Sequence, residues 1–228
     1  MINKHNSIIT NIKKAKSPYL IAEIGINHNG NMKLAKKMIK SAKENGAHCV
    51  KFQLFSADDY ISKFASKAKY QDTKNTKKSS QFEIIKKTQI TIDQFKELNE
   101  YSRKINIDFL CTPFELESFR KMLKSGVKSV KISSCNLDNT IFLKEIAKSN
   151  IEVLLSTGMG NIEEVQKAYK IFKNKKKLII FQCTSNYPSN LKNSNLNVIK
   201  TYKKMFRVPI GFSDHTVGNI SSIVSVAF

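Results

Sequence analysis

Residues 19–53 read YLIAEIGINHNGNMKLAKKMIKSAKENGAHCVKFQ and predict a strand, a helix and a second strand, in that order. The first β-rich run covers residues 19–24. Apolar residues then recur at helical spacing over residues 32–45, with lysines between them, and Gly46 supplies a C-terminal stop. A second β-rich run covers residues 48–53. Strands joined through a helix in this way predict a parallel pair with a right-handed crossover.

The same alternation continues along the chain. Five later β-rich runs cover residues 107–111, 129–133, 152–156, 178–183 and 208–212. Helical patterns separate them, and two of these begin with capping boxes, Thr91 with Gln94 and Asn161 with Glu164. The one long interruption, residues 56–87, is rich in lysine, and we expect a mobile loop there.

Seven strands that alternate with helices predict either a doubly wound sheet or a TIM-type (β/α)₈ barrel. No Gly-x-Gly-x-x-Gly follows the first strand, and each strand ends in a different polar cluster. Chemistry built from many strand ends is typical of the barrel. We therefore expect an α/β barrel that lacks its eighth strand, because the chain stops within the seventh helix.

The charge is strongly basic, with 39 lysines and arginines against 18 acidic residues and a formal net charge of +21. Only three of the basic residues are arginines, the residue that binds guanine edges and phosphates through two parallel hydrogen bonds. We therefore expect no nucleic-acid partner and a general attraction for small anions. No apolar run approaches the roughly 20 residues that span a bilayer, and no signal peptide is present, so we expect a cytoplasmic protein without a membrane partner.

The cysteines are far apart in the sequence and form no Cys-x-x-Cys pair. They are Cys49, Cys111, Cys135 and Cys183. This spacing favours reduced, structurally buried thiols over a zinc site or a disulfide framework.

Polar side chains follow each predicted strand, where a barrel places its site. Lys51 and Lys131 lie inside β-rich runs. A buried, unpaired charge there carries a free-energy cost on the order of several kcal/mol unless an anion binds next to it. Together with Ser and Thr hydroxyls they predict a site for a small phosphorylated carbon acid. Glu23 is either an acid or base or a salt-bridge partner of a lysine, and His215 is either a metal ligand or an ordinary loop residue.

Seven motifs, taken in order, resemble the sialic acid synthase family, which comprises the N-acetylneuraminate, legionaminate and pseudaminate synthases. The motifs are IAEIGINHNG (residues 21–30), VKFQ (50–53), CTPF (111–114), KISS (131–134), LSTGM (155–159), CTSNYP (183–188) and GFSDHT (211–216). The resemblance covers nearly the whole chain from Ser17, which makes residues 1–16 an N-terminal extension and residues 17–228 an incomplete synthase barrel.

This resemblance implies an enzyme that condenses phosphoenolpyruvate with the open-chain aldehyde of an N-acetylated hexosamine such as N-acetylmannosamine. The products are a nine-carbon 2-keto acid and phosphate. It also implies a divalent metal, Mn²⁺ or Mg²⁺, and a homodimer. The alternatives are another phosphoenolpyruvate-condensing barrel that acts on a sugar phosphate, and a non-catalytic remnant that binds anions.

Site residues follow from the positions that match the family's motifs. The implied phosphoenolpyruvate cradle is Lys51, Thr112, Lys131, Ser134, Ser156, Ser185 and Ser213. The implied sugar contacts are Glu23, Gln53 and Tyr187. The resemblance further implies that Glu23, Lys51 and Lys131 are catalytic, with Glu23 as a proton carrier, and that His215 is one of two metal histidines.

The chain departs from the family pattern in two places. Asn136 stands where many members have an acidic residue, and an amide cannot transfer a proton as a carboxylate does. The family's second metal histidine lies on the eighth strand, and a small antifreeze-like domain follows it. Neither is in this sequence, and we therefore expect a truncated chain with weak or no activity.

Overall fold

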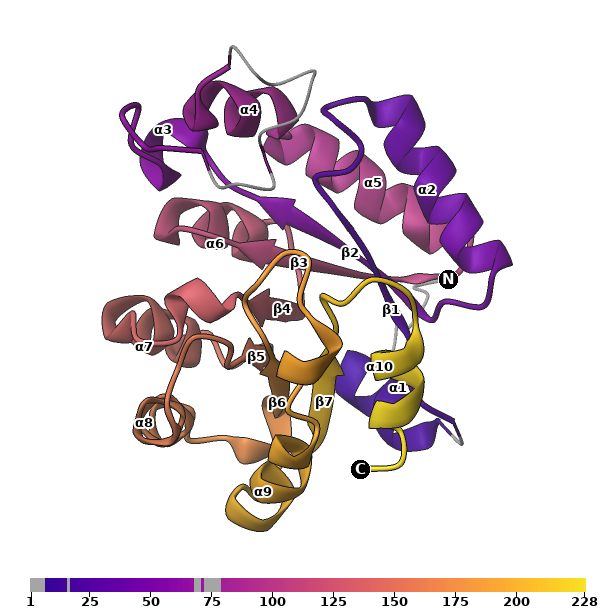
Figure 1. The fold of residues 1–228 in the computed structure, drawn as a ribbon. Coiled ribbons are helices and arrows are strands. Elements are labelled where there is room, and N and C mark those ends of the chain that lie inside the picture. Colours follow the sequence, from indigo (N-terminus) through magenta and orange to yellow (C-terminus); the bar gives the residue numbers. More distant parts are fainter. Residues whose placement is uncertain (1–6, 16, 68–70, 72–78) are drawn as a thin grey trace. The chain divides into compact units, whose positions relative to one another are not determined.

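A computed structural model describes residues 7–15, 17–67, 71 and 79–228. The chain divides into two compact units, Met1–Lys128 and Ser129–Phe228. Each unit contains a parallel sheet whose strands follow one another in chain order (Figure 1). This order is the one expected when every strand is joined to the next through a helix.

The first unit has a three-stranded sheet made of β1 (Ile21–Gly25), β2 (Cys49–Leu54) and β3 (Asp108–Pro113). Its described helices are α1 (Ile8–Lys14), α2 (Met32–Glu44), α3 (Ala57–Tyr60), α4 (Gln81–Thr88), α5 (Ile92–Lys104) and α6 (Leu116–Lys124). Helices α2 and α5 lie side by side (Figure 1). Their apolar stripes, with Ile39 and Phe95 fully buried, cover the sheet because helical spacing puts these residues on one face.

The second unit has a four-stranded sheet made of β4 (Ser129–Ile132), β5 (Glu152–Ser156), β6 (Leu178–Cys183) and β7 (Ile210–Ser213). Its helices are α7 (Thr140–Lys148), α8 (Ile162–Ile171), α9 (Asn197–Met205) and α10 (Ile220–Ser225). Strands β5 and β6 are buried along their whole length. Residues 153–155 of β5 and 178–181 of β6 are continuous apolar runs rather than alternating ones, as is typical of parallel strands covered on both faces.

Strand positions are the best-predicted feature. All seven expected strands are present among the described residues, and each bound differs from the expected one by two residues at most. Both expected capping boxes are also confirmed, at Thr91 with Gln94 and at Asn161 with Glu164. A third one, Ser80 with Glu83, begins α4 and was not anticipated.

The prediction of a mobile loop at residues 56–87 is wrong for much of the part that the structure describes. Helices α3 and α4 form there, and Phe55, Ala57 and Ile85 make a small buried cluster against Phe82 and Phe114. Apolar contacts of this kind order a segment that its lysine content alone suggests is mobile. Its most lysine-rich stretch, residues 68–70 and 72–78, lies outside the described residues.

The predicted N-terminal extension contains α1, which buries Ile8 and Ile9. Asn11 Nδ2 donates a 2.7 Å hydrogen bond to Asp108 Oδ2 at the start of β3, and the Tyr19 hydroxyl donates to the same oxygen. One carboxylate oxygen therefore ties the N-terminal segment to the sheet.

Three cysteines are buried as expected, but the expectation is wrong for Cys135, which is exposed, and all four are free. Cys135 lies in the short 3₁₀ turn after β4, outside the sheet core. No helix among the described residues has both the length and the apolar character needed to cross a membrane.

The shared oxygen of Asp108 yields a prediction for stability. Asp108→Asn removes the charge from two hydrogen bonds, so we expect the free energy of unfolding to fall by about 1–3 kcal/mol. Chemical denaturation followed by circular dichroism measures it. Asp93→Asn is the control, because Asp93 pairs with Lys96 on an exposed helix face, where an ion pair contributes about 0–1 kcal/mol. Equal losses in the two variants would contradict the prediction.

Candidate functional site

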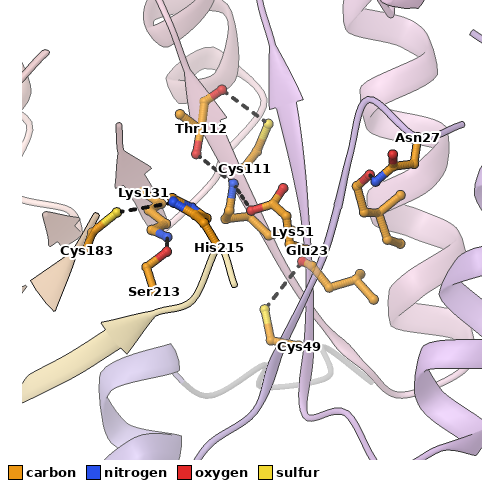
Figure 2. A network of polar contacts seen from close by, with 12 residues as sticks. Glu23, Asn27, Cys49, Lys51, Cys111, Thr112, Lys131, Cys183, Ser213 and His215 are labelled. Carbon is orange, nitrogen blue, oxygen red and sulfur yellow. Dashed lines mark hydrogen bonds and ion pairs between the residues drawn. The ribbon is translucent and has the colours of Figure 1, made fainter. Parts of the chain in front are cut away.

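Lys51 is the centre of a polar cluster in the first unit. Its side chain projects from the middle of β2 and is 6% exposed. The Nζ atom lies 2.6 Å from Glu23 Oε2 and donates to Thr112 Oγ1 at 3.2 Å (Figure 2). Glu23 is directly opposite Lys51 in the β1–β2 pair, and Thr112 follows on β3. The register of three parallel strands therefore brings an ammonium group, a carboxylate and a hydroxyl together.

The side chains of Glu23 and Gln53 both approach the backbone of Gly25. A Cβ atom on Gly25 would lie 3.0 Å from Glu23 Oε1 and 3.3 Å from Gln53 Nε2. A β-bulge between Glu23 and Gly25 interrupts the pairing here, and Gly25 has φ of +55°. The bulge and the missing side chain leave room for the two polar groups beside Gly25.

Lys131 is the centre of a second cluster, in the second unit. Its Nζ atom donates to Ser213 Oγ at 2.9 Å (Figure 2) and lies 5.2 Å from the centroid of the Phe181 ring. Phe181 is opposite Gly211 in the β6–β7 pair, and a Cβ on Gly211 would lie 2.6 Å from the ring. Gly211 therefore gives the ring its space, and the ring face attracts the ammonium group.

Serine hydroxyls follow the strands of the second unit. Ser156 Oγ is buried at the end of β5 and has no hydrogen-bond partner among the described residues. The hydroxyls of Ser134 and Ser185 both lie close to Gly158, where a Cβ would be 3.0 Å from Ser134 Oγ and 2.5 Å from Ser185 Oγ. A buried hydroxyl without a partner carries a free-energy cost that a bound polar ligand would remove.

His215 lies in the loop after β7. Its Nδ1–H donates to the Thr184 carbonyl at 2.7 Å, which orients the ring and leaves Nε2 as the nitrogen with the free lone pair. The ring also lies 4.2 Å, centroid to centroid, from that of Tyr187. Burial lowers the pKa of His215, but the contacts with Cys183 and the Thr184 carbonyl raise it more, so that the net shift is upward.

Neighbouring groups fix the loop that carries His215. Asp214 accepts hydrogen bonds from the amide and hydroxyl of Thr216 and from the hydroxyl of Ser222. Burial raises the pKa of Asp214, but these donors lower it more, so this carboxyl stays ionised. Its oxygens are therefore engaged in holding the loop.

The donor set for a divalent metal is incomplete in the described part of the chain. Metal-bound histidines commonly donate their second nitrogen to a carbonyl, as His215 does. Among the described residues, however, no three His, Cys, Asp or Glu side chains gather where a metal could bind. His215 fits the role of a single ligand, and these residues do not by themselves form a metal site.

The residues proposed from the sequence thus fall into the two units. The first unit holds Glu23, Lys51, Gln53 and Thr112. The second unit holds Lys131, Ser134, Ser156, Ser185, Tyr187, Ser213 and His215. Asn136 is buried and accepts from Asn139 Nδ2 at 3.1 Å, so the amide has a structural contact beside the start of α7.

Phe181 was missed by the sequence reasoning, which counted it as part of a buried strand. The signal that pointed to it is Gly211, since glycine inside a strand often marks the close approach of another group.

Parallel α/β units whose strand ends carry lysine ammonium groups and serine hydroxyls define a protein of the (β/α)₈ class with anion-binding groups at those ends. The chain matches the NeuB family over residues 38–228. It is 40% identical over 216 residues to N,N'-diacetyllegionaminic acid synthase from Campylobacter jejuni. The aligned region covers 93% of this chain and 65% of that protein. This chain therefore belongs to the NeuB family.

Solved structures agree with this assignment. N-acetylneuraminic acid synthetase from Leptospira borgpetersenii, in complex with citrate, has a TM-score of 0.82 and 33% identity, covering 92% of this chain and 69% of that one. A truncated 3-deoxy-D-arabino-heptulosonate 7-phosphate synthase from Thermotoga maritima has a TM-score of 0.64 and 14% identity, covering 91% and 71%, and supports the fold alone. The expected fold class is confirmed. The chain spans 60% to 65% of the length of three curated relatives.

The space that Gly211 leaves for Phe181 can be tested. Gly211→Ala would push the ring away from Lys131, so we expect the free energy of unfolding, measured by chemical denaturation, to fall by about 1–3 kcal/mol, as is usual when a close contact is overpacked. Lys144→Ala, at an exposed position on α7 of the same unit, is the control. An unchanged free energy of unfolding in Gly211→Ala would contradict the prediction.

Proposed function

We propose that this chain carries the phosphoenolpyruvate-binding and sugar-binding residues of a synthase that joins phosphoenolpyruvate to an acetamido sugar. The observation that supports it most is the Lys131 cluster, in which a lysine ammonium group, a partnerless buried hydroxyl and three further serines follow successive strands. Such a set suits a small anion with several oxygen atoms. Membership of the NeuB family and similarity to the C. jejuni N,N'-diacetyllegionaminic acid synthase supply the reaction class.

In the proposed reaction, C3 of phosphoenolpyruvate forms a bond to the aldehyde carbon of the open-chain sugar. Water adds to C2, and the C2–O bond to phosphate then breaks. The products are a nine-carbon 2-keto acid and inorganic phosphate. The ammonium group of Lys131 would offset the negative charge of phosphoenolpyruvate and of the leaving phosphate.

Serine hydroxyls would orient the bound anion. Ser156 is the best placed for this role, because its buried Oγ has no other partner among the described residues. Ser134, Ser185 and Ser213 would add neutral donors whose geometry, unlike that of a flexible ammonium group, selects one orientation of the ligand.

Glu23 and Gln53 are the proposed contacts to the sugar. A carboxylate and an amide that both lie close to Gly25 offer acceptors and donors to hydroxyl and acetamido groups. Glu23 is 48% exposed and ion-paired with Lys51, so a ligand can reach its carboxylate. Tyr187, half-exposed beside His215, would cover the sugar with its ring.

Replacement of Lys131 tests the proposal. Lys131→Met keeps the length of the side chain but removes the charge, and we expect the affinity for phosphoenolpyruvate, measured by calorimetry, to fall by about ten- to a hundredfold. Lys144→Met, an exposed position on α7 of the same unit, is the control. Phosphate release with N-acetylmannosamine or with a diacetamido-trideoxyhexose then identifies the acceptor. A wild-type chain that binds no phosphoenolpyruvate would rule the proposal out.

We further propose that a divalent metal is required and that His215 is one of its ligands. A bound metal would act as a Lewis acid toward the sugar aldehyde. In any preparation that releases phosphate, we expect chelation by EDTA to stop the release and Mn²⁺ to restore it. We expect His215→Ala to raise the Mn²⁺ concentration needed for half-maximal rate by about tenfold or more. Release that continues in EDTA would contradict a metal requirement.

A further inference from the structure

Tyr202 makes a polar contact that the proposed reaction does not use. It lies on α9 and is 5% exposed. Its hydroxyl is 3.0 Å from Thr157 Oγ1, directly after the end of β5. Its ring packs edge-on against Phe206, 5.5 Å between centroids. The ring therefore has apolar packing of its own, and the hydroxyl is the part of the side chain that reaches the sheet.

The hydrogen bonds of Thr157 decide which of the two hydroxyls donates. Thr157 Oγ1 donates its single proton to the Phe181 carbonyl at 2.9 Å, and the Thr157 amide donates to the same carbonyl at 3.2 Å. The Tyr202 hydroxyl therefore donates to Thr157 Oγ1. Burial raises the pKa of Tyr202 by more than the contact with Thr157 lowers it, so the hydroxyl keeps the proton that it donates.

These bonds connect a helix to the ends of two strands. The last pair between β5 and β6 is Ser156 opposite Phe181, and the bonds from Thr157 to the Phe181 carbonyl continue that pairing by one residue. Tyr202 adds a contact from α9 to the same point. The end of β5 is thus fastened to β6 by a chain of hydrogen bonds that begins on the helix.

The opposite face of these strands carries the proposed phosphoenolpyruvate site. Successive side chains along a strand point to opposite faces, so Ser156 faces away from Thr157 and from α9. Phe181 is opposite Ser156 in the parallel pair and shares its face. The Phe181 ring lies 5.2 Å from Lys131 Nζ, which puts the ammonium group on that face too. Tyr202 therefore supports, from the helix side, the strand ends on which the site is built.

The turn after Thr157 brings two more hydroxyls of the site into contact with the same backbone. A Cβ on Gly158 would lie 2.5 Å from Ser185 Oγ and 3.0 Å from Ser134 Oγ. A displacement of Thr157 would therefore move both of its neighbours in the chain. The Ser156 hydroxyl would shift on one side, and the backbone that contacts the other two serines would shift on the other.

We propose that Tyr202 is a positioning residue for the phosphoenolpyruvate site, holding the end of β5 through Thr157 so that the Ser156 hydroxyl keeps its place. This inference rests on the proposed function, because it assigns Lys131 and Ser156 to phosphoenolpyruvate. A tyrosine hydroxyl that only satisfied a buried polar group would contribute to stability and leave the affinity for the ligand unchanged. Affinity and stability, measured together, separate the two roles.

Variants at both ends of the contact remove one hydroxyl at a time. Tyr202→Phe removes only the oxygen and keeps the ring against Phe206. Thr157→Val replaces the hydroxyl with a methyl group, whereas Thr157→Ser keeps the hydroxyl. Ser129→Ala is the matched control, because Ser129 Oγ donates a buried 2.8 Å hydrogen bond to Glu152 Oε2 between β4 and β5, at the opposite end of the same sheet.

Calorimetry on the full chain measures the affinity for phosphoenolpyruvate, and chemical denaturation measures the stability. We expect Tyr202→Phe and Thr157→Val each to weaken phosphoenolpyruvate binding by about three- to tenfold. Thr157→Ser should bind within about twofold of wild type, because it keeps both the donor and the acceptor. Ser129→Ala should lower the denaturation midpoint at least as much as Tyr202→Phe, since its lost bond is to a carboxylate, but bind within about twofold of wild type.

The double variant Tyr202→Phe/Thr157→Val tests whether the two hydroxyls act as one unit. If Tyr202 acts through Thr157, its hydroxyl has no further effect once that of Thr157 is gone. The double variant should therefore bind phosphoenolpyruvate within about twofold of Thr157→Val alone. Two independent groups would instead give fold-losses that multiply.

Four outcomes would overturn the inference: wild-type affinity in Tyr202→Phe, losses that multiply in the double variant, an equal loss of affinity in Ser129→Ala, or equal binding by Thr157→Val and Thr157→Ser. The last comparison decides the question even where Tyr202→Phe does not fold. A wild-type chain that binds no phosphoenolpyruvate would refute the proposed function and this inference with it. A wild-type chain that binds it, with Tyr202→Phe unchanged, would refute the positioning role alone.

Discussion

A lysine ammonium group in the middle of a parallel strand needs polar partners, because burying a charge without them carries a free-energy cost on the order of several kcal/mol. The two units meet this constraint differently. Lys51 contacts a carboxylate and a hydroxyl from the two neighbouring strands. Lys131 contacts a serine hydroxyl from β7 and the face of Phe181 on β6. In both units the partners come from other strands, so the strand register determines whether the charge is stabilised.

The absence of a side chain is as important as the polar groups. Gly25 leaves room for the side chains of Glu23 and Gln53, and Gly211 leaves room for the Phe181 ring next to Lys131. At both positions a methyl group would come within 3.0 Å of the neighbouring atoms, closer than van der Waals contact allows. Glycine therefore contributes to the geometry of each cluster because it has no side chain to fill the space that the polar and aromatic groups occupy.

Some features could be predicted from the sequence, and others could not, for identifiable reasons. The apolar runs of β5 and β6 and the capping boxes at Thr91 and Asn161 are local patterns, so they were found at nearly the right residues. The ordered cluster around Phe55 and Ile85 was missed, because its partners are far apart in the chain and lie in a segment dominated by lysine. Cys135 was expected to be buried because cysteine usually is, but the turn after β4 leaves it exposed.

Local order along the chain is already present in the amino-acid sequence. The alternation of strands and helices, the polar residues at the strand ends and the resemblance to one family all depend on short segments whose periodicity and composition are independent of what they contact. The choice of partner for each polar group depends on the tertiary structure. Glu23 was left open as an acid or a salt-bridge partner, and only the β1–β2 register puts its carboxylate on Lys51. Ser213 reaches Lys131 across 82 residues of sequence, because the strands in between bring their ends to one edge of the sheet.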